Sequence, residues 1–172
     1  HHDAMNHLGA ALALLKGLPD TAMRAHWELT LLLSLGPVLM DVRGYGAPEV
    51  GATYTRALEL CERTGEASQR FATQLGLRIH HLVRGEYALA TDLGQEMLGT
   101  ARDANDAGFL VEAHGALGSC FFLQGDFDAA RRHVEEALAI YDPEQHQAHV
   151  FAHGVEPGVR ALSYLGLTLW FQ

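Results

Sequence analysis

The stretch LGSCFFLQGDFDAARRHVEEALAIYDP, from Leu117 to Pro143, consists of helix-forming residues interrupted once, at Gly125-Asp126. Gly125 can adopt the left-handed conformation that ends a helix, and Asp126 can accept a hydrogen bond from the first turn of the next helix. Ala130 and Ala137 are two helical turns apart, so both lie on one face of the second helix. We therefore predict a hairpin of two antiparallel helices that approach each other closely through small residues.

This hairpin is one copy of an internal repeat. The segment YTRALEL (54–60) has the counterparts GQEMLGT (94–100) and VEEALAI (134–140), each displaced by 40 residues. Glycines precede these segments at nearly the same interval, at Gly44, Gly85 and Gly125. A repeated hairpin has no interior pocket of its own, so its function is expected to lie on its surface.

The copy ALGSCFFLQGDFDAARRHVEEALAIYDP resembles the tetratricopeptide repeat (TPR) in its small residue Gly118, its aromatic Phe121, its Gly-Asp-Phe turn and its terminal proline. The spacing of 40 residues exceeds the roughly 34 of the standard repeat, which indicates lengthened loops. The resemblance implies an all-α fold. The expected architecture is a right-handed α-α superhelix, a TPR-like solenoid built from antiparallel helical hairpins.

We expect residues 1–172 to form a single TPR-like repeat domain that is an excerpt of a longer solenoid. The expected hairpins are about 21–64, 67–103 and 107–142, with incomplete hairpins at about 1–18 and 155–172.

A wider resemblance covers nearly the whole chain. The pieces LPDT…GYGAPEV, HHLVRGEYALA and YDPEQH…GVEPGV…LSYL…LW are similar to the TPR-like tails of large bacterial signal-transduction ATPases of the AAA/STAND type. Many of those proteins also carry an adenylate/guanylate cyclase domain. The resemblance implies a regulatory array that binds a ligand or partner, while catalysis resides in other domains.

Composition excludes several classes of protein. A net charge of −9, with 48% apolar and 19% charged residues, is typical of a soluble globular protein without a basic footprint for nucleic acid or anionic membrane. No apolar run reaches the roughly 18 to 20 residues of a membrane span. Cys61 and Cys120 lie in helical apolar patterns and are interpreted as small buried hydrophobes in a reducing cytosol. We expect a cytoplasmic protein that binds no cofactor.

The first helix of each TPR hairpin lines the concave surface of the array. Carrying this pattern over places six candidate protein-binding residues on or near a groove: Met40, Leu82, Ser119, Phe122, Arg160 and Trp170. The functional hypothesis is an apolar groove for a peptide or helix, with Arg160 as a polar anchor. The alternative is that several of these side chains pack against adjacent repeats.

Three histidines, His146, His149 and His153, fall at i, i+3 and i+7 and could present imidazoles to zinc if their segment is helical. The alternative is a structural role near an inter-repeat loop, and we expect no metal. A small metal-assisted enzyme built on these histidines is the third functional class considered.

The favoured hypothesis is a non-catalytic interaction or sensing array that controls attached nucleotide-handling domains of a bacterial signalling protein. Its partner is a protein or peptide, or a neighbouring domain of the same chain, and not nucleic acid or membrane. The alternative is an oligomerisation element that brings attached catalytic domains together, in which exposed hairpin faces at the two ends form a homodimer.

Overall fold

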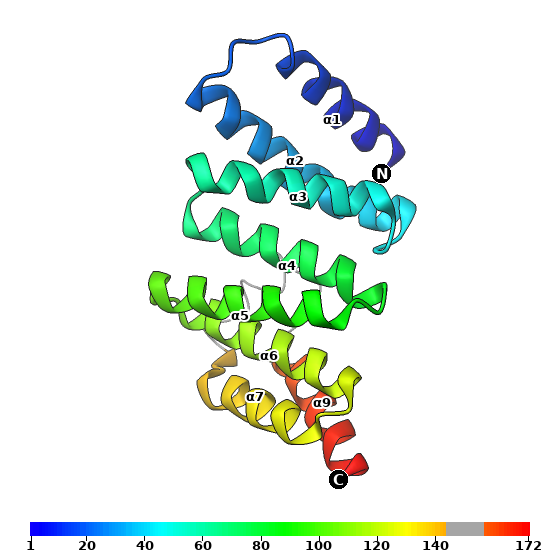
Figure 1. Cartoon of the computed structure of the whole chain (residues 1–172), viewed down its shortest axis with the longest axis vertical. Helices are drawn as coiled ribbons and strands as arrows, with labels where there is room; N and C mark the ends of the chain where they lie inside the picture. The colour runs from blue at the N-terminus through cyan, green and yellow to red at the C-terminus, as the bar shows by residue number, and fades with distance from the viewer. Residues whose placement is uncertain (144–156) are drawn as a thin grey trace. The chain divides into compact units, whose positions relative to one another are not determined.

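The computed structural model describes residues 1–143 and 157–172. Across these two ranges the chain is helical and contains no strand (Figure 1). The helices are α1 (His2–Leu15), α2 (Ala22–Arg43), α3 (Pro48–Thr64), α4 (Ala67–Val83), α5 (Tyr87–Ala104), α6 (Ala107–Gln124), α7 (Phe127–Ile140) and α9 (Pro157–Phe171).

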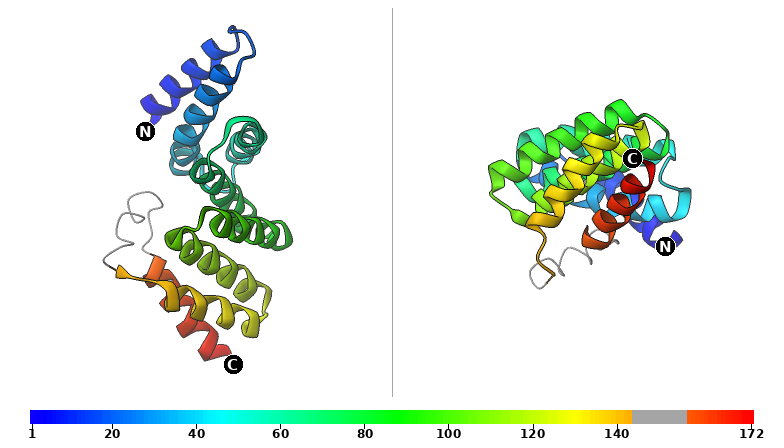
Figure 2. Two further views of the ribbon diagram at one scale, coloured as in Figure 1. Left: turned by 90° about the vertical axis from the view of Figure 1, so that its left-hand side faces the viewer. Right: turned by 90° about the horizontal axis from the view of Figure 1, so that it is seen from below.

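The chain divides into two compact units, His1–Glu86 with α1 to α4 and Tyr87–Gln172 with α5, α6, α7 and α9. In the first unit α1 packs on α2, α2 on α3 and α3 on α4; in the second, α5 packs on α6, α6 on α7 and α7 on α9. Consecutive helices within each unit run antiparallel (Figure 2). The prediction of an all-α fold of antiparallel helical hairpins is confirmed.

The turn between α6 and α7 has the predicted caps. Gly125 is left-handed, with φ of 79°, and the Asp126 carboxylate accepts a hydrogen bond of 2.9 Å from the Ala129 amide. The turn before α6 is built alike, because Asp106 accepts from the Phe109 amide at 2.9 Å. Such caps satisfy backbone groups that a helix end would leave unpaired, at roughly 1 kcal/mol each.

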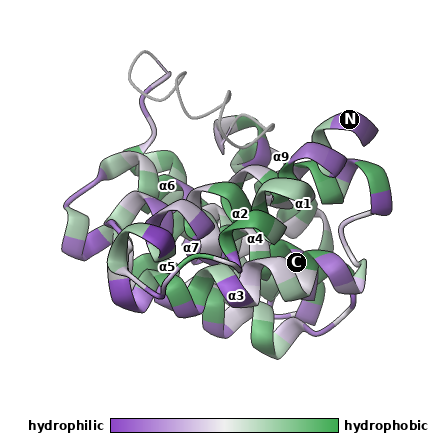
Figure 3. Cartoon of the chain, turned by 90° about the horizontal axis from the view of Figure 1, so that it is seen from above, coloured by the Kyte–Doolittle hydropathy of each residue, from purple (hydrophilic) through white to green (hydrophobic). Residues whose placement is uncertain are grey.

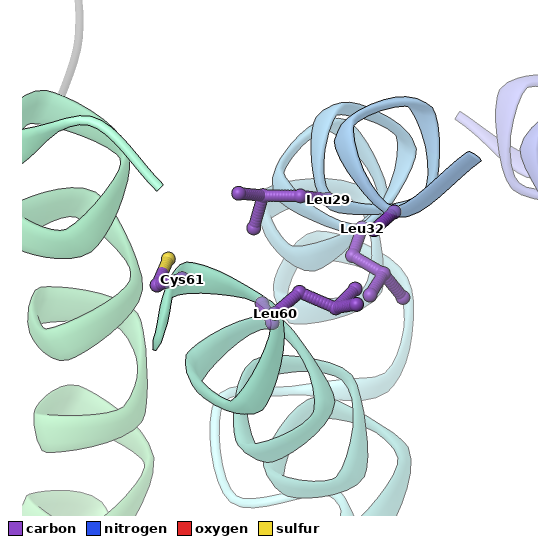
Figure 4. Close-up of a cluster of buried hydrophobic side chains, with 6 residues drawn as sticks. Leu29, Leu32, Leu60 and Cys61 are labelled. Atoms are coloured by element: carbon purple, nitrogen blue, oxygen red, sulfur yellow. The ribbon is translucent and has the colours of Figure 1, made fainter. Parts of the chain in front are cut away.

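The core of the first unit includes leucines contributed by two adjacent helices. Leu29 and Leu32 of α2 lie against Leu60 and Cys61 of α3, and the exposed fraction of each is 7% or less (Figure 4). Burying each leucine stabilises the unit by about 2 kcal/mol. Burial raises the pKa of the Cys61 thiol. Cys61 and Cys120 are both buried, as predicted.

A tyrosine of α3 fills the space left by two glycines on neighbouring helices. The Tyr54 ring lies where a Cβ on Gly36 of α2 or on Gly76 of α4 would stand. Only 4% of Tyr54 is exposed, and desolvation raises the pKa of its hydroxyl to about 12. The two glycines therefore set how closely α2 and α4 approach α3.

The second unit uses the same device. A Cβ on Gly118 of α6 would lie 2.5 Å from Cγ1 of Val134 on α7, and a Cβ on Gly94 of α5 would lie 2.8 Å from Cδ2 of Leu117. Ala130 and Ala137 of α7 are both fully buried, as their spacing predicts. Small residues thus let α6 pack closely against the helices on either side of it.

Helices α3, α4, α5 and α7 are amphipathic, and hydrophobic and hydrophilic residues alternate along their ribbons (Figure 3). None of the helices in the described part of the chain combines the length and the apolarity that a membrane crossing requires.

Replacing Ala130 by leucine tests the helix pairing. Ala130 is 0% exposed, so the added carbons have no room and α7 must shift from α6. We expect Ala130→Leu to lower the unfolding free energy by about 1 to 3 kcal/mol, measured by guanidinium unfolding. The matched control is Ala139→Leu at an exposed site of α7, which should change it by less than about 0.5 kcal/mol. Equal midpoints for the two variants would contradict the pairing.

Candidate protein-binding surface

Helix α9 packs through one face and exposes another. Ala161 and Thr168 are buried, and Ala161 joins Val111 of α6 and Ala137 of α7 in one apolar cluster. This contact fixes the rotation of α9 about its own axis. The residues on its opposite side therefore have a defined direction toward solvent.

The exposed side of α9 is apolar. Leu162 is 60% exposed, Leu169 49% and Trp170 84%, and a Cβ on Gly166 would meet no atom within 4 Å. These four residues, at i, i+4, i+7 and i+8, form one stripe, here named the α9 apolar face. A helix that is apolar on both sides is typical of a position covered on both sides, so the α9 apolar face is a candidate interaction surface.

Trp170 is the one predicted groove residue with most of its surface free. It lies on the last turn of α9, within the α9 apolar face. Tryptophan brings large apolar area at little cost in conformational entropy, and it is enriched among residues that dominate binding energy.

Phe122, the other aromatic of the predicted groove, packs inside the second unit. Its ring centroid lies 5.6 Å from Phe127, 5.5 Å from Tyr164 and 5.9 Å from Phe171, and Phe127 stacks on Phe171. This cluster joins α6, α7 and α9. The half-buried Phe122 therefore helps to hold α9 in place, and its contact with a partner stays a prediction.

Arg160 is bound to a buried carboxylate. Its Nη1 donates to Oε1 of Glu112 on α6 at 2.8 Å, and the Glu112 side chain is only 2% exposed. The guanidinium lies over Gly115, where a Cβ would be 3.0 Å from Nη2. Arg160 thus compensates a buried charge between α6 and α9, and its role as a polar anchor for a partner stays a prediction.

The remaining groove candidates are less exposed than predicted. Met40 is 8% exposed and Ser119 2%, with the Ser119 hydroxyl donating to the Ala116 carbonyl at 2.7 Å. Both side chains are therefore unavailable to a partner, which corrects the prediction for these two positions. Leu82 of α4 is half-buried. Met40 and Ser119 thus follow the alternative given above, in which the side chain packs inside the array.

The proposed histidine stripe, His146, His149 and His153, lies outside the described residues. Among the residues that are described, no group of three or more histidine, cysteine, aspartate or glutamate side chains could hold a metal ion. The tandem His80 and His81 take up separate contacts. His80 Nδ1 lies 3.0 Å from the Tyr45 carbonyl, and His81 Nδ1 lies 2.6 Å from the Glu86 carboxylate.

Sequence reasoning missed a histidine pair in the second unit. The Nδ1 atoms of His114 on α6 and His133 on α7 lie 3.2 Å apart, so one nitrogen donates a proton and the other accepts it. Desolvation lowers the pKa of both imidazoles, that of His133 to about 4. The Phe121 ring stacks on His133. The two histidines are 19 residues apart, so only the helix pairing brings them together.

No protein-family model matches the sequence, and no curated protein matches it. Sixteen chains of solved structures match its fold. Among them is RapI in its apo form, with a TM-score of 0.72 and 15% sequence identity over 95% of this chain. The chain spans 58% of the length of that RapI chain. At this identity the likeness shows the fold alone, which is the predicted all-α, TPR-like helical repeat.

Phe122→Ala tests whether the aromatic cluster is structural. We expect the variant to lose about 2 kcal/mol of unfolding free energy, because truncation of a half-buried ring leaves a gap between α6, α7 and α9. Trp170→Ala is the control and should change the unfolding free energy by less than about 0.5 kcal/mol. Chemical denaturation of both variants measures this, and a Phe122→Ala protein as stable as wild type would contradict the cluster.

The histidine pair predicts a pH dependence of stability. The unfolded chain binds a proton at His133 below about pH 6.5, whereas the folded protein resists protonation down to about pH 4. The contribution is complete above pH 6.5 and is lost as the pH falls toward 4. Arg102 of α5 and Arg132 of α7 disfavour the charged imidazoles, while Glu136 favours them.

We expect His133→Gln to reduce the loss of melting temperature between pH 6.5 and pH 4 relative to wild type. Other groups titrate in this range, so the difference between the two proteins is the quantity to measure. His26→Gln, at an exposed site, is the control and should follow the wild-type curve. Parallel curves for all three proteins would contradict the proposed role of the pair.

Proposed function

We propose that the chain is a non-catalytic protein-interaction array that regulates attached nucleotide-handling domains of a bacterial signalling protein. The single observation that carries the interaction role is the α9 apolar face, with Leu162, Leu169 and Trp170 exposed beside an open Gly166. The regulatory role and the attached domains rest on the sequence resemblance to the tails of signal-transduction ATPases.

The chemistry of the face favours a protein partner. Leucine and tryptophan side chains offer apolar area without a charge that could select a nucleotide or a metal. Gly166 has no side chain, and no atom lies within 4 Å of where its Cβ would stand, so a side chain of a facing helix could approach the backbone there. A partner helix with its own apolar stripe is the complement of this surface, and it would be a neighbouring domain of the same chain or a separate protein.

Regulation would follow from a shift in population. Because α9 is held by contacts with α6 and α7, a partner on its outer face stabilises the arrangement of all three helices. If the attached domains favour one arrangement over another, the partner shifts the equilibrium by its difference in affinity for the two. No new chemistry is needed in the array itself.

The same observation supports an oligomerisation element as the second candidate. An apolar stripe on one helix can pair with the identical stripe of a second copy about a two-fold axis. This contact would bring the attached catalytic domains of two chains together. The two candidates differ in whether the α9 apolar face meets itself or another sequence.

The double variant Leu162→Ser/Trp170→Ser tests both candidates. We expect it to fold as wild type does, because both side chains are mostly exposed, and to bind its partner roughly tenfold or more weakly. The readouts are light scattering coupled to size exclusion across a range of concentrations, and affinity capture from an extract of the cells that encode the protein.

The matched control is Met23→Ser/Leu89→Ser, which removes two other exposed apolar side chains, 58% and 50% exposed. If wild type and control capture the same protein and the variant Leu162→Ser/Trp170→Ser does not, the result supports the interaction array. A concentration-dependent dimer with the same pattern supports the oligomerisation element. Capture and mass that are equal in all three proteins would contradict both.

A further inference from the structure

A cavity of about 280 Å³ lies in the first unit among α1, α2 and α3. Its apolar wall consists of leucines from two helices, Leu12 and Leu15 of α1 and Leu32 and Leu35 of α2. Leu12 also packs against the buried cluster around Leu29 and Leu60. One side of the cavity therefore borders the core, and its volume is just below the roughly 300 Å³ at which ligand pockets begin.

Cations outnumber carboxylates in the polar part of the cavity. Lys16, Arg24, Arg56 and Glu28 line it, so three positive charges face one negative charge. This excess stands out in a chain with a net charge of −9 whose only lysine is Lys16. The positive charges lie beside the leucines, so a small ligand in the cavity would contact both apolar and cationic side chains.

Arg56 is matched by protein carboxylates. Its Nε donates to Glu28 Oε1 at 2.7 Å, its Nη2 lies 3.3 Å from Glu28 Oε2, and its Nη1 donates to Glu59 at 2.9 Å. These hydrogen bonds raise the pKa of Arg56. Both oxygens of Glu28 thus contact Arg56, so Glu28 neutralises little of the charge of a second cation.

Arg24 is incompletely matched. Its Nη1 donates to the Leu18 carbonyl at 3.3 Å, and its Nη2 lies 3.9 Å from Glu28. Its Nε is buried and has no hydrogen-bond partner in the described part of the chain. A buried N–H without a partner is costly, and a ligand oxygen would remove that cost. Lys16, nearby on the cavity wall, makes no ion pair within the described ranges.

We propose that this cavity binds a small aliphatic carboxylate, with its carboxylate at Arg24 and Lys16 and its hydrocarbon against the four leucines. A carboxylate matches the planar guanidinium and carries one negative charge. Inorganic phosphate would leave the four leucines without an apolar contact, and an uncharged hydrocarbon would leave the Arg24 Nε–H unsatisfied. This site is separate from the α9 apolar face and does not depend on the proposed function.

Binding there would also order α1. No residue of α1 is buried, although its Leu12 and Leu15, and Lys16 directly after it, form part of the cavity wall. A ligand that contacts these residues together with α2 adds apolar contacts to a helix that has few of its own. We therefore expect hydrogen exchange in α1 to slow when the site is occupied.

Titration calorimetry with octanoate tests the site, with octanol as the uncharged analogue of equal chain length. Octanoate should bind at least roughly tenfold more tightly than octanol, the factor given by one charge-assisted hydrogen bond. The same carboxylate chemistry is found at a peptide terminus, so Ala-Ala-Leu with a free carboxylate is compared with its amide. Tighter binding of octanoate identifies a free acid as the source, and tighter binding of the peptide a chain terminus.

Two variants locate the carboxylate. Arg24→Met keeps an unbranched stem but removes the guanidinium, and Lys16→Met does the same at an exposed position that cannot affect the core. Each should weaken binding of the tighter carboxylate by roughly tenfold. Arg63→Met is the matched control, because Arg63 pairs with Asp20 outside the cavity at 3.4 Å, and it should bind as wild type does.

Three outcomes would overturn the proposal. These are no binding of either carboxylate, equal binding of octanoate and octanol, and unchanged affinity in both Arg24→Met and Lys16→Met. If Arg24→Met fails to fold, Lys16→Met and the protection of α1 from hydrogen exchange in the wild-type protein still decide the question.

Discussion

The close approach of helices at glycine is the constraint on which the rest of the structure depends. The Tyr54 ring fills the space beside Gly36 and Gly76, Val134 fills the space beside Gly118, and Leu117 fills the space beside Gly94. In each contact a large side chain of one helix occupies the space that a missing Cβ leaves on the next. Because these side chains enter at single positions, they fix both the separation of the helices and the register along their axes. The caps at Gly125 and Asp126 then fix where the chain reverses.

Gly166 of α9 differs from these glycines in having nothing within reach of a Cβ. The sequence Leu165-Gly166 repeats Leu117-Gly118, so α9 carries the same docking feature as α6 with no side chain in it. The leucines and the tryptophan around that position are the residues a facing helix would cover. At the glycines named above a large side chain of a neighbouring helix fills the space, and at Gly166 that space is open. A helix with a large apolar side chain opposite Gly166 would therefore complement this surface.

The sequence was sufficient for the elements whose causes are local. Glycine and aspartate at the turn, and alanines two turns apart, act within one hairpin and predict its caps and its buried face. The groove residues depend instead on how each helix is rotated against neighbours far away in sequence, and one position along a helix turns a side chain by about 100°. Phe122 therefore meets Tyr164 and Phe171, and Arg160 meets Glu112, contacts that no local pattern encodes.

Helical repeats of this kind pack mainly against their neighbours in the chain, so the effect of a local change stays local. The α9 apolar face belongs to the second unit and the cationic cavity to the first, and each is built from helices of its own unit. Substitutions in one should therefore add to those in the other, without an interaction energy, if the units respond independently. A measured interaction energy between Trp170→Ser and Arg24→Met in unfolding or binding would show instead that the two units are energetically coupled.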